Sequence, residues 1–384
     1  MTTHRVAAPG PLAGTATPRG TTRFATGAIA GGADGQGCAP DMFRALPGGL
    51  VVGALGIGTH LGEPDDETDA QYATALCAAL GAGVNLVDTA INYRSQRSER
   101  AIGAALRAAM QSGRVQRDGV VLCTKGGYVP LDGALPPTRE AYRAYVEREY
   151  LAPRLLERAD LVAGGHSITP AFLAHSLAQS RANLGVRCID LYYLHNPEQQ
   201  REVRGPTAFR TQLRGAVELL ETKVAAGEIG AWGVATWQGL RVPPDDPGHL
   251  SLADVVTVAR EVAGASHHLR VVQMPVNLAM PEAVRLPTQT LRADGPRVTA
   301  LEAAVELGLG VVATAPLLQG RLTSGLPNAL AETFPGCESD AQRALAFVLA
   351  LPGVAAAVCG MRSPTHVAEN LAVLRAREEP LVEG

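Results

Sequence analysis

The sequence predicts a parallel α/β barrel of eight strands. Short apolar runs alternate eight times with longer segments of helical periodicity. Three of these runs end in an ionisable side chain, namely Asp88, Lys125 and His195. The chain of 384 residues can hold one barrel of about 250 residues with insertions. The carboxyl ends of all strands share one rim of such a barrel, so these side chains are expected to converge.

The expected strands are short and rich in branched residues, as parallel strands buried on both faces are. A doubly wound open sheet is the alternative, and it would need a glycine-rich phosphate loop after the first strand. Gly56 and Gly58 lie there, but the third glycine of that fingerprint is missing and no helix follows. The barrel strands are expected at 51–57, 85–88, 120–124, 189–195, 229–235, 269–274, 310–315 and 354–359.

The helices between these strands are expected to begin at capping residues and to end at glycines. Asp65 or Asp66 precedes the first helix, Thr169 and Pro170 open another, and Gly185 ends that one. The helices are expected over 66–80, 98–110, 169–184, 209–226, 252–263, 298–307, 340–351 and 365–376.

Two segments lie outside this alternation. Residues 1–45 are rich in Gly, Ala, Thr and Pro, so we expect a flexible or strap-like N-terminal extension before a single barrel domain, 46–384. Residues 126–168 form a long insertion after the third strand, with a helix expected over 139–156. Such a connection is often a wall or lid over the site. A purely decorative helix is an equal alternative.

Composition excludes several classes of protein. The net charge of −3 and the lack of a long apolar run predict neither a nucleic-acid nor a membrane partner. The six cysteines form no CxxC pair, which indicates a reducing, cytoplasmic location. The sequence contains no HExxH motif and therefore predicts no metal site of that kind. It also contains no GxSxG elbow, which a serine hydrolase would need. Nothing in the sequence indicates an oligomeric state.

Lysine usage draws attention to one strand end. Among 34 lysines and arginines, Lys125 and Lys223 are the only lysines. Where arginine fills nearly every basic position, a lysine at a strand end suggests a role that a guanidinium cannot take, because an ammonium is compact and its pKa shifts readily.

Asp88, Tyr93, Lys125 and His195 together suit acid–base chemistry at a carbonyl group. An ammonium close to Tyr93 would lower the pKa of its phenol from about 10, and a carboxylate would hold that ammonium in place. His195 could donate a hydrogen bond to a substrate oxygen. None of these groups carries a hydride, so reduction would need a cofactor. A Schiff-base lyase using Lys125 and a dinucleotide-sensing module with little turnover are the alternatives.

The sequence resembles the aldo-keto reductases over about residues 50–374. The similarity lies in several short motifs that occur in the family's order, which makes the set specific although each motif alone is weak. They are DTAINY (88–93), SERAIG (98–103), TK (124–125), DLYYLHNP (190–197), GVATW (233–237), QMPVN (273–277), APLLQG (315–320), GMRSP (360–364) and EN (369–370).

The resemblance implies an (α/β)8 barrel and NADPH-dependent carbonyl reduction, with NADH less favoured and no metal. Tyr93 matches the general acid, Asp88 and Lys125 the pair that tunes it, and His195 the histidine that orients the substrate. The resemblance also implies that Gln273 holds the nicotinamide carboxamide, with residues 360–370 around the adenosine end. Further expected cofactor contacts are Thr59, Thr236, Pro316, Leu317, Gln319, Gly320, Arg321, Gly360, Met361, Arg362, His366, Glu369 and Asn370; expected substrate walls are His60, Arg94 and Trp237.

The chain departs from the family pattern at the cofactor site. The usual Ser-Asn pair after the fifth strand is Ala235-Thr236, and the aromatic position of the seventh strand is Thr314. His366 stands where the family often has a basic residue, one turn before Glu369. Arg94 stands where a glycine commonly follows the tyrosine. NADPH preference therefore depends mainly on Arg362.

Overall fold

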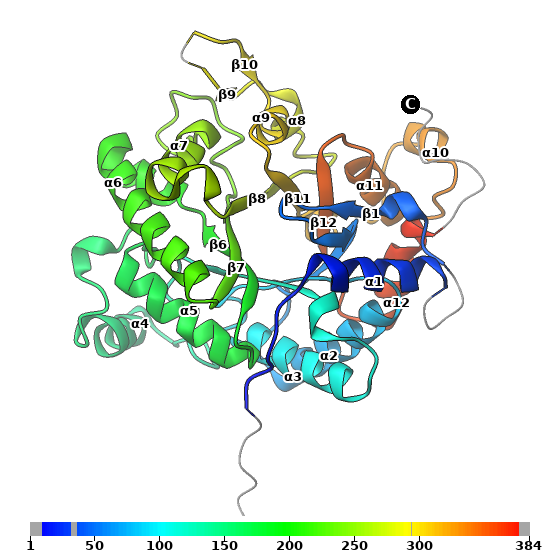
Figure 1. Ribbon diagram of the computed structural model, residues 1–384, viewed down its shortest axis with the longest axis horizontal. Helices are drawn as coiled ribbons and strands as arrows, with labels where there is room; N and C mark the ends of the chain where they lie inside the picture. The colour runs from blue at the N-terminus through cyan, green and yellow to red at the C-terminus, as the bar shows by residue number, and fades with distance from the viewer. Residues whose placement is uncertain (1–9, 32–36, 293, 376–384) are drawn as a thin grey trace, which may run out of the picture.

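The computed structural model describes residues 10–31, 37–292 and 294–375. Eight parallel strands close into a barrel in the order β11-β12-β3-β4-β5-β6-β7-β8, and helices surround it (Figure 1). This confirms the predicted barrel. The barrel strands are β3 (Leu55–Gly58), β4 (Leu86–Asp88), β5 (Val121–Gly126), β6 (Ile189–His195), β7 (Ile229–Ala235), β8 (Leu269–Pro275), β11 (Gly310–Thr314) and β12 (Val354–Gly360).

The first expected strand, 51–57, is wrong as a single element. Its first half, β2 (Val51–Gly53), pairs antiparallel with β1 (Phe43–Ala45), and only β3 enters the barrel. The Asn85 side chain binds β2 at both ends, because its oxygen accepts from Gly53 N at 2.9 Å and its nitrogen donates to the Val51 oxygen at 2.9 Å. An apolar run does not show where a buried chain turns, so periodicity could not separate the two strands.

Most helices lie where their caps predict them. The Asp65 side chain accepts from Thr68 N and caps the first barrel helix, and Gly185, with φ of 63°, ends α5. The main helices are α2 (Asp66–Gly81), α3 (Arg97–Gln111), α5 (Pro170–Leu184), α6 (Glu198–Ala225), α7 (Leu252–Ala263), α9 (Ala300–Glu306), α11 (Asp340–Leu349) and α12 (Pro364–Leu371); the short ones are α8 (Glu282–Arg285) and α10 (Ala329–Thr333), and β9 (Gln289–Thr290) pairs with β10 (Arg297–Val298).

Helix α6 differs from its expected span of 209–226. It begins at Glu198 and is interrupted at Gly205, whose φ of 77° is not helical. Pro206 follows and opens the second part, where its missing N–H is no loss. The first part was missed because residues 198–204 are mostly polar and show no apolar periodicity.

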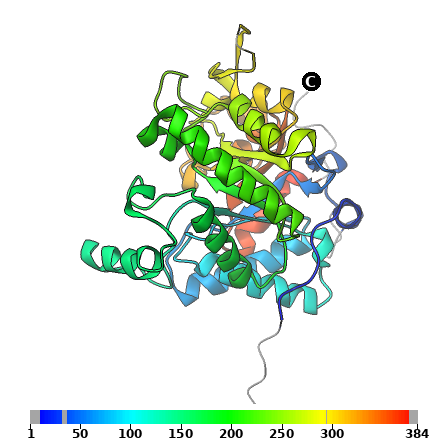
Figure 2. The same cartoon turned by 60° about the vertical axis from the view of Figure 1, so that its left-hand side comes forward.

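The N-terminal segment contains a helix that the sequence analysis did not expect, α1 (Pro18–Ile29). Thr17 caps it and Pro18 occupies its first position. The helix packs on β2 and on the short turn η2 (Arg117–Gly119), outside the barrel helices (Figures 1 and 2). Upstream of it, Leu12 forms a parallel bridge with Val186.

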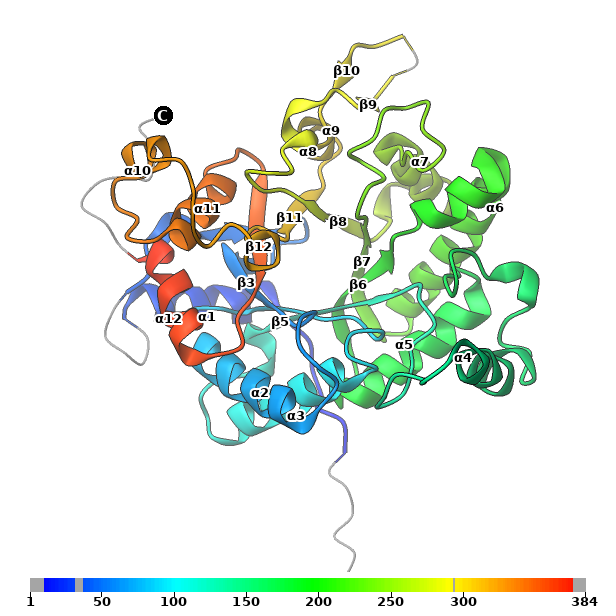
Figure 3. The same ribbon diagram turned by 180° about the vertical axis from the view of Figure 1, so that it is seen from behind.

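The insertion after β5 forms a lobe beside α5, seen at the edge of the molecule in Figure 3. It carries α4 (Arg139–Val146), which continues as one π-helical turn, η3 (Glu147–Leu151). The expected helix over 139–156 is therefore shorter. Among the described residues, none of the helices is both long and apolar enough to span a bilayer.

Asp190 ties the N-terminal segment to the barrel. One carboxylate oxygen accepts from Thr15 Oγ1 and from Ala16 N, the latter at 2.6 Å. The other oxygen accepts from Arg117 Nη2 at 2.8 Å and from Leu122 N at 2.7 Å. Because Asp190 is 2% exposed, its removal would leave the Thr15, Ala16 and Leu122 donors without this acceptor, and Arg117 Nη2 with only the Cys188 oxygen.

Replacing Asp190 with Asn should therefore lower the free energy of unfolding by about 3 kcal/mol, since it leaves the Arg117 charge buried and uncompensated. Urea denaturation followed by circular dichroism measures the loss. The control is Asp118→Asn in the exposed ion pair with Arg23, which should cost about 0.5 kcal/mol. Equal losses in both variants would contradict the anchoring role.

Candidate active site

The alternation of side chains along each strand brings the polar residues together at the barrel mouth. Residues two apart on a strand point to the same face. Asp88, Lys125, His195 and Gln273 each stand two positions after a residue of the apolar cluster that fills the barrel. Those inner residues are Leu86, Cys123, Tyr193 and Val271. The four polar side chains therefore face inward at the carboxyl rim, where the chemistry of such barrels takes place.

Lys125 lies at the centre of this group. Its Nζ donates to Asp88 Oδ2 at 2.5 Å, to the backbone oxygen of Thr89 at 2.9 Å and to Tyr93 Oη at 3.3 Å. Lys125 is 1% exposed and Asp88 is 4% exposed. Gln273 Nε2 binds the other Asp88 oxygen at 2.9 Å. The Lys125 ammonium and the Asp88 carboxylate thus neutralise each other, and each also has further hydrogen-bond partners.

The sequence predicted a lowered pKa for the Tyr93 phenol, and this prediction is wrong. Burial raises this pKa above 10, and although Lys125 opposes this, the net direction is upward. For Lys125, burial lowers the pKa, but Asp88 and Tyr93 outweigh it and the pKa is raised. Burial was underestimated from the sequence because it depends on all the segments that cover the rim. The pair is therefore a protonated phenol beside a charged ammonium.

His195 is held from its backbone side by a second histidine. His166 Nε2 donates to the His195 backbone oxygen at 2.7 Å, and Gln200 Nε2 donates to His166 Nδ1 at 3.0 Å. Burial lowers the pKa of His166 to about 4, and burial followed by the charge of Lys125 lowers that of His195 well below 6.5. Both imidazoles are therefore neutral near pH 7.

Aromatic rings surround the Tyr93 hydroxyl. His60 meets the Tyr93 ring edge-on with centroids 4.8 Å apart, and His195 does so at 5.9 Å. Tyr128 packs against His195 at 4.9 Å, and its hydroxyl accepts from Asn196 and Gln199, each at 2.7 Å. These contacts fix the ring orientations around the space above Tyr93.

A cavity of about 730 Å³ opens from this point toward β12 and α12. Tyr93, Asp88 and His195 line it, whereas Lys125 lies behind Tyr93 and is not part of the wall. Of the residues expected to bind cofactor or substrate, those that line the cavity are Thr59, His60, Thr236, Trp237, Gln273, Pro316, Leu317, Gln319, Gly320, Gly360, Arg362, His366, Glu369 and Asn370.

Three expected contacts lie elsewhere. Met361 is fully buried in the core, and Arg321 is exposed outside the cavity. Arg94 turns away from the main cavity, and its guanidinium binds Asp69 Oδ1 at 2.6 Å and the backbone oxygen of Glu63 at 2.8 Å. Neighbouring residues in a motif thus differ in direction once the loop turns, and Arg94 instead lines a second cavity of about 350 Å³ beside the main one.

The chain around Arg94 has an uncommon backbone. Arg94, Ser95 and Gln96 have φ of 49°, 54° and 69°, in the left-handed region that non-glycine residues seldom occupy. The Arg94 ion pair and its hydrogen bonds to the 63–69 segment offset that strain. The ammonium-bound Tyr93 stands at the start of this turn.

Two expected carboxamide contacts are already partly used. The Thr236 hydroxyl oxygen accepts from Gly239 N at 2.9 Å, so it supports its own loop. Gln273 uses its amide nitrogen on Asp88, which leaves its oxygen as an acceptor at the cavity. At the opposite end, Ser363 caps α12 through His366 N, and Arg362 lies exposed beside that helix start.

The structure adds cavity residues that the motifs did not indicate. Asn92, Tyr128 and Asn196 line it beside the catalytic candidates, as do Leu61 and Thr323. Asn92 and Asn196 flank Tyr93 and His195 in the sequence, a signal that could have found them. Tyr128 follows two glycines after Lys125 and gave none. Within the described ranges, no group of three or more His, Cys, Asp or Glu could hold a metal ion.

Sequence similarity to known proteins shows the family of this chain. The profile of the aldo/keto reductase family matches residues 50–242, about half of the chain. The chain belongs to the aldo/keto reductase family. This confirms the family that the motifs indicated. In an aldo/keto reductase barrel, a polar cluster at the carboxyl rim next to a long cavity is the expected place for the site.

Individual relatives are distant. A D-threo-aldose 1-dehydrogenase from Pseudomonas sp is 30% identical over 198 residues, which cover 50% of this chain and 52% of that protein; the match thus spans about half of that relative's length. An aldo/keto reductase from Klebsiella pneumoniae in complex with NADP and acetate has a TM-score of 0.55 at 23% identity, covering 87% and 89% of the two chains. The holo form of one from Bacillus halodurans has 0.57 at 21%, covering 88% and 92%. These structures support the barrel fold.

The lowered pKa of His166 predicts acid sensitivity. The folded protein binds this proton only near pH 4, whereas the unfolded chain binds it near 6.5. His166 therefore stabilises the fold above pH 6.5, and that contribution, about 3 kcal/mol, is lost as the pH falls from 6.5 to 4. Urea denaturation across this range measures the loss.

In His166→Gln the unfolding free energy should change less steeply between pH 6.5 and 4. The difference in slope from the wild type should correspond to at most one proton bound on unfolding. An identical slope in the wild type and in His166→Gln would refute a neutral buried His166.

Proposed function

We propose that the protein catalyses NADPH-dependent reduction of an aldehyde or ketone, and the reverse oxidation, with Tyr93 as general acid. The observation that carries this is the Tyr93 hydroxyl at 3.3 Å from the Lys125 ammonium, next to a neutral histidine at the wall of a large cavity. A phenol in that position can give a proton to a carbonyl oxygen.

The cavity residues fit a dinucleotide. The free oxygen of Gln273 can accept from the carboxamide nitrogen of a nicotinamide, while its nitrogen stays on Asp88. At the far end, Arg362 forms no ion pair within the described part of the chain, and a guanidinium suits a ribose phosphate. Gln319 and Leu318 have φ of 55° and 45°, so an irregular turn borders the middle of the cavity.

Each side chain has a defined part in the proposed reaction. NADPH, when bound, would supply the hydride to the carbonyl carbon. The neutral His195 ring donates one N–H to the carbonyl oxygen and orients it. Tyr93 gives its proton to that oxygen as negative charge develops there, and the Lys125 ammonium stabilises the phenolate that remains. Asp88 keeps Lys125 charged and in place.

With its pKa raised above 10, Tyr93 is protonated at neutral pH, as a proton donor must be. The relative named as an aldose dehydrogenase supports hydroxylated carbonyl compounds as the substrate class. A dinucleotide-sensing module, the alternative with little turnover, would retain the cavity without needing a proton donor.

Replacing Tyr93 with Phe should lower kcat for NADPH-dependent aldehyde reduction by about 10²-fold to 10⁴-fold, the contribution of a general acid. Absorbance of NADPH measures turnover. Quenching of Trp237, which lines the cavity, should show unchanged NADPH affinity, since the ring of Phe fills the same space. Trp232 is fully buried in the outer core and should not respond. Wild-type turnover in this variant would remove Tyr93 from the mechanism.

The Schiff-base lyase is disfavoured by the state of Lys125. Imine formation needs a neutral amine at the substrate, whereas Lys125 has a raised pKa and is shielded behind Tyr93. Borohydride added with an aldehyde should therefore leave Lys125 unmodified, as peptide mass spectrometry would show. A reference protein with free lysines, treated alongside, reports that the reagent is active. An adduct on Lys125 would favour the lyase.

A further inference from the structure

A buried acid lies behind the strand that carries Lys125. Glu99, on α3, is 0% exposed. Its Oε1 accepts a hydrogen bond from Thr124 Oγ1 at 2.6 Å, and its Oε2 accepts one from Asn183 Nδ2 at 2.8 Å. Side chains alternate along a strand, so Thr124 faces outward from β5 while Lys125, the next residue, faces into the barrel. Glu99 therefore binds the outer face of β5 at the position next to the ammonium.

The environment of Glu99 is costly for an acid. Thr124 and Asn183 are neutral donors, and burial raises the pKa of the Glu99 carboxyl above its usual range. A leucine would fill a similar space without removing a polar group from water. The contribution of Glu99 is therefore expected in the hydrogen bonds that it makes and not in its packing.

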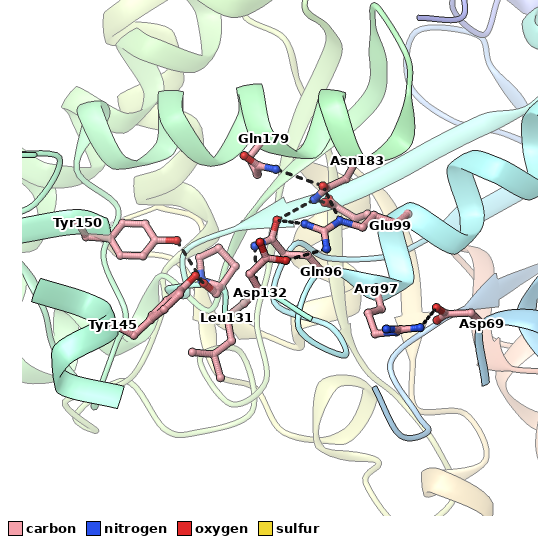
Figure 4. A network of polar contacts seen from close by, with 12 residues as sticks. Asp69, Gln96, Arg97, Glu99, Leu131, Asp132, Tyr145, Tyr150, Gln179 and Asn183 are labelled. Carbon is pink, nitrogen blue, oxygen red and sulfur yellow. Dashed lines mark hydrogen bonds and ion pairs between the residues drawn. The ribbon is translucent and has the colours of Figure 1, made fainter. Parts of the chain in front are cut away.

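The same acid is connected to the turn that follows Tyr93. Asn183 Nδ2, which donates to Glu99, also donates to Gln96 Oε1 at 3.0 Å. Gln96 is the last of the three left-handed residues after Tyr93, and it is 4% exposed. Figure 4 shows Glu99, Asn183 and Gln96 directed toward one another. Glu99 and Asn183 thus hold the turn after Tyr93 as well as β5.

The insertion is attached to the same network, as Figure 4 also shows. Gln96 Nε2 donates to the Leu131 backbone oxygen at 2.9 Å. Arg100, which follows Glu99 on α3, pairs with Asp132 at 2.7 Å. Both contacts join the beginning of the insertion to the first turn of α3.

A backbone hydrogen bond from Gly133 N to Ser95 O at 2.9 Å adds a further attachment between the insertion and the turn after Tyr93. Leu131 and Leu135 line the second cavity together with Tyr93. The insertion is therefore a wall beside Tyr93, and not the decorative helix that the sequence left as an alternative.

Tyr93 and Lys125 come from two separate segments, and their hydrogen bond of 3.3 Å needs both to be correctly placed. Lys125 Nζ must also meet Asp88 and the Thr89 backbone oxygen, so a shift of β5 would disturb several contacts at once. Glu99 binds the two segments from the outer side of the barrel wall and does not line the main cavity. It can therefore hold their relative position while contacting neither substrate nor cofactor.

We propose that Glu99 is a positioning residue for the reaction: its carboxyl group holds β5 and the turn after Tyr93 in the relative position that brings the phenol to the Lys125 ammonium. The effect on rate rests on the proposed carbonyl reduction, whereas the effect on Lys125 is a property of the folded protein. Loss of the Glu99 hydrogen bonds should therefore change kcat and the surroundings of Lys125, with the fold and cofactor affinity preserved.

Glu99→Leu should lower kcat for NADPH-dependent aldehyde reduction by roughly tenfold to 100-fold, since a misplacement of about 1 Å has effects of this size. KM for NADPH should stay near its wild-type value. Thr124→Val, which deletes only the hydroxyl group that reaches Glu99, should lower kcat in the same way and serves as the test where Glu99→Leu does not fold. Glu99→Gln keeps an oxygen for Asn183 and a donor for the Thr124 hydroxyl, and should retain most of the wild-type kcat.

The pH dependence of alcohol oxidation separates positioning from a loss of stability. The reverse reaction needs the Tyr93 phenolate, and the Lys125 charge favours that form. With Lys125 displaced, the oxidation rate in Glu99→Leu should rise at a higher pH than in the wild type. The other titratable groups around Tyr93 are unchanged in this variant; they are Asp88, His60, His195 and Tyr128.

Leu177→Ala is the control for a merely structural effect. Leu177 is 1% exposed on α5, in the apolar core and without a polar side-chain atom. Its truncation should lower the melting temperature and leave kcat and the pH profile at their wild-type values. An equal fall of kcat in Leu177→Ala, or wild-type kinetics in both Glu99→Leu and Thr124→Val, would overturn the proposal.

The presence of only two lysines in the chain allows a test that needs no turnover. In protein labelled with nitrogen-15 lysine, the ammonium groups of Lys125 and Lys223 give two resonances, which Lys223→Arg assigns. Glu99→Leu should shift the Lys125 resonance and leave that of Lys223, which pairs with Glu228 at 2.9 Å. If the wild type reduces no aldehyde, the proposed function is wrong and this experiment alone decides the positioning role. An unchanged Lys125 resonance refutes it.

Discussion

The buried ion pair between Asp88 and Lys125 is the interaction on which the site depends. Two charges removed from water are tolerated only when each is fully matched, and the loss of either one would strand the other. Lys125 meets this condition with three acceptors, and Asp88 is matched by Lys125 and Gln273. The pair therefore fixes the ends of β4, β5 and β8 relative to one another. It also fixes where Tyr93 must place its hydroxyl.

A second ion pair stabilises the loop that carries Tyr93. Three successive left-handed residues follow it, each at a cost of about 1–3 kcal/mol, and the Arg94 guanidinium offsets this by binding Asp69 and two backbone oxygens. The same turn lines the second cavity. Backbone strain and the position of Tyr93 are thus coupled through Arg94.

Burial explains why the histidines and the tyrosine are neutral. His166 is fully buried and His195 and Tyr93 are largely covered by neighbouring segments, and each pKa moves toward the uncharged form. Neutral groups that donate hydrogen bonds suit a reaction in which charge appears only as the carbonyl is reduced. The insertion contributes to this by covering the outer side of Tyr93.

The sequence by itself determined the barrel, the family and the convergence of Asp88, Lys125 and His195, because strand alternation and the shared rim are local and repetitive properties. It failed for the strand at 51–57 and for the start of α6, where a turn or a polar segment breaks the apolar pattern. Only the tertiary structure decided the direction of the Arg94 side chain, the sign of the Tyr93 pKa shift and the existence of the second cavity. Each of these depends on segments far apart in the chain, since burial and ion pairing sum over all the neighbours that folding brings together.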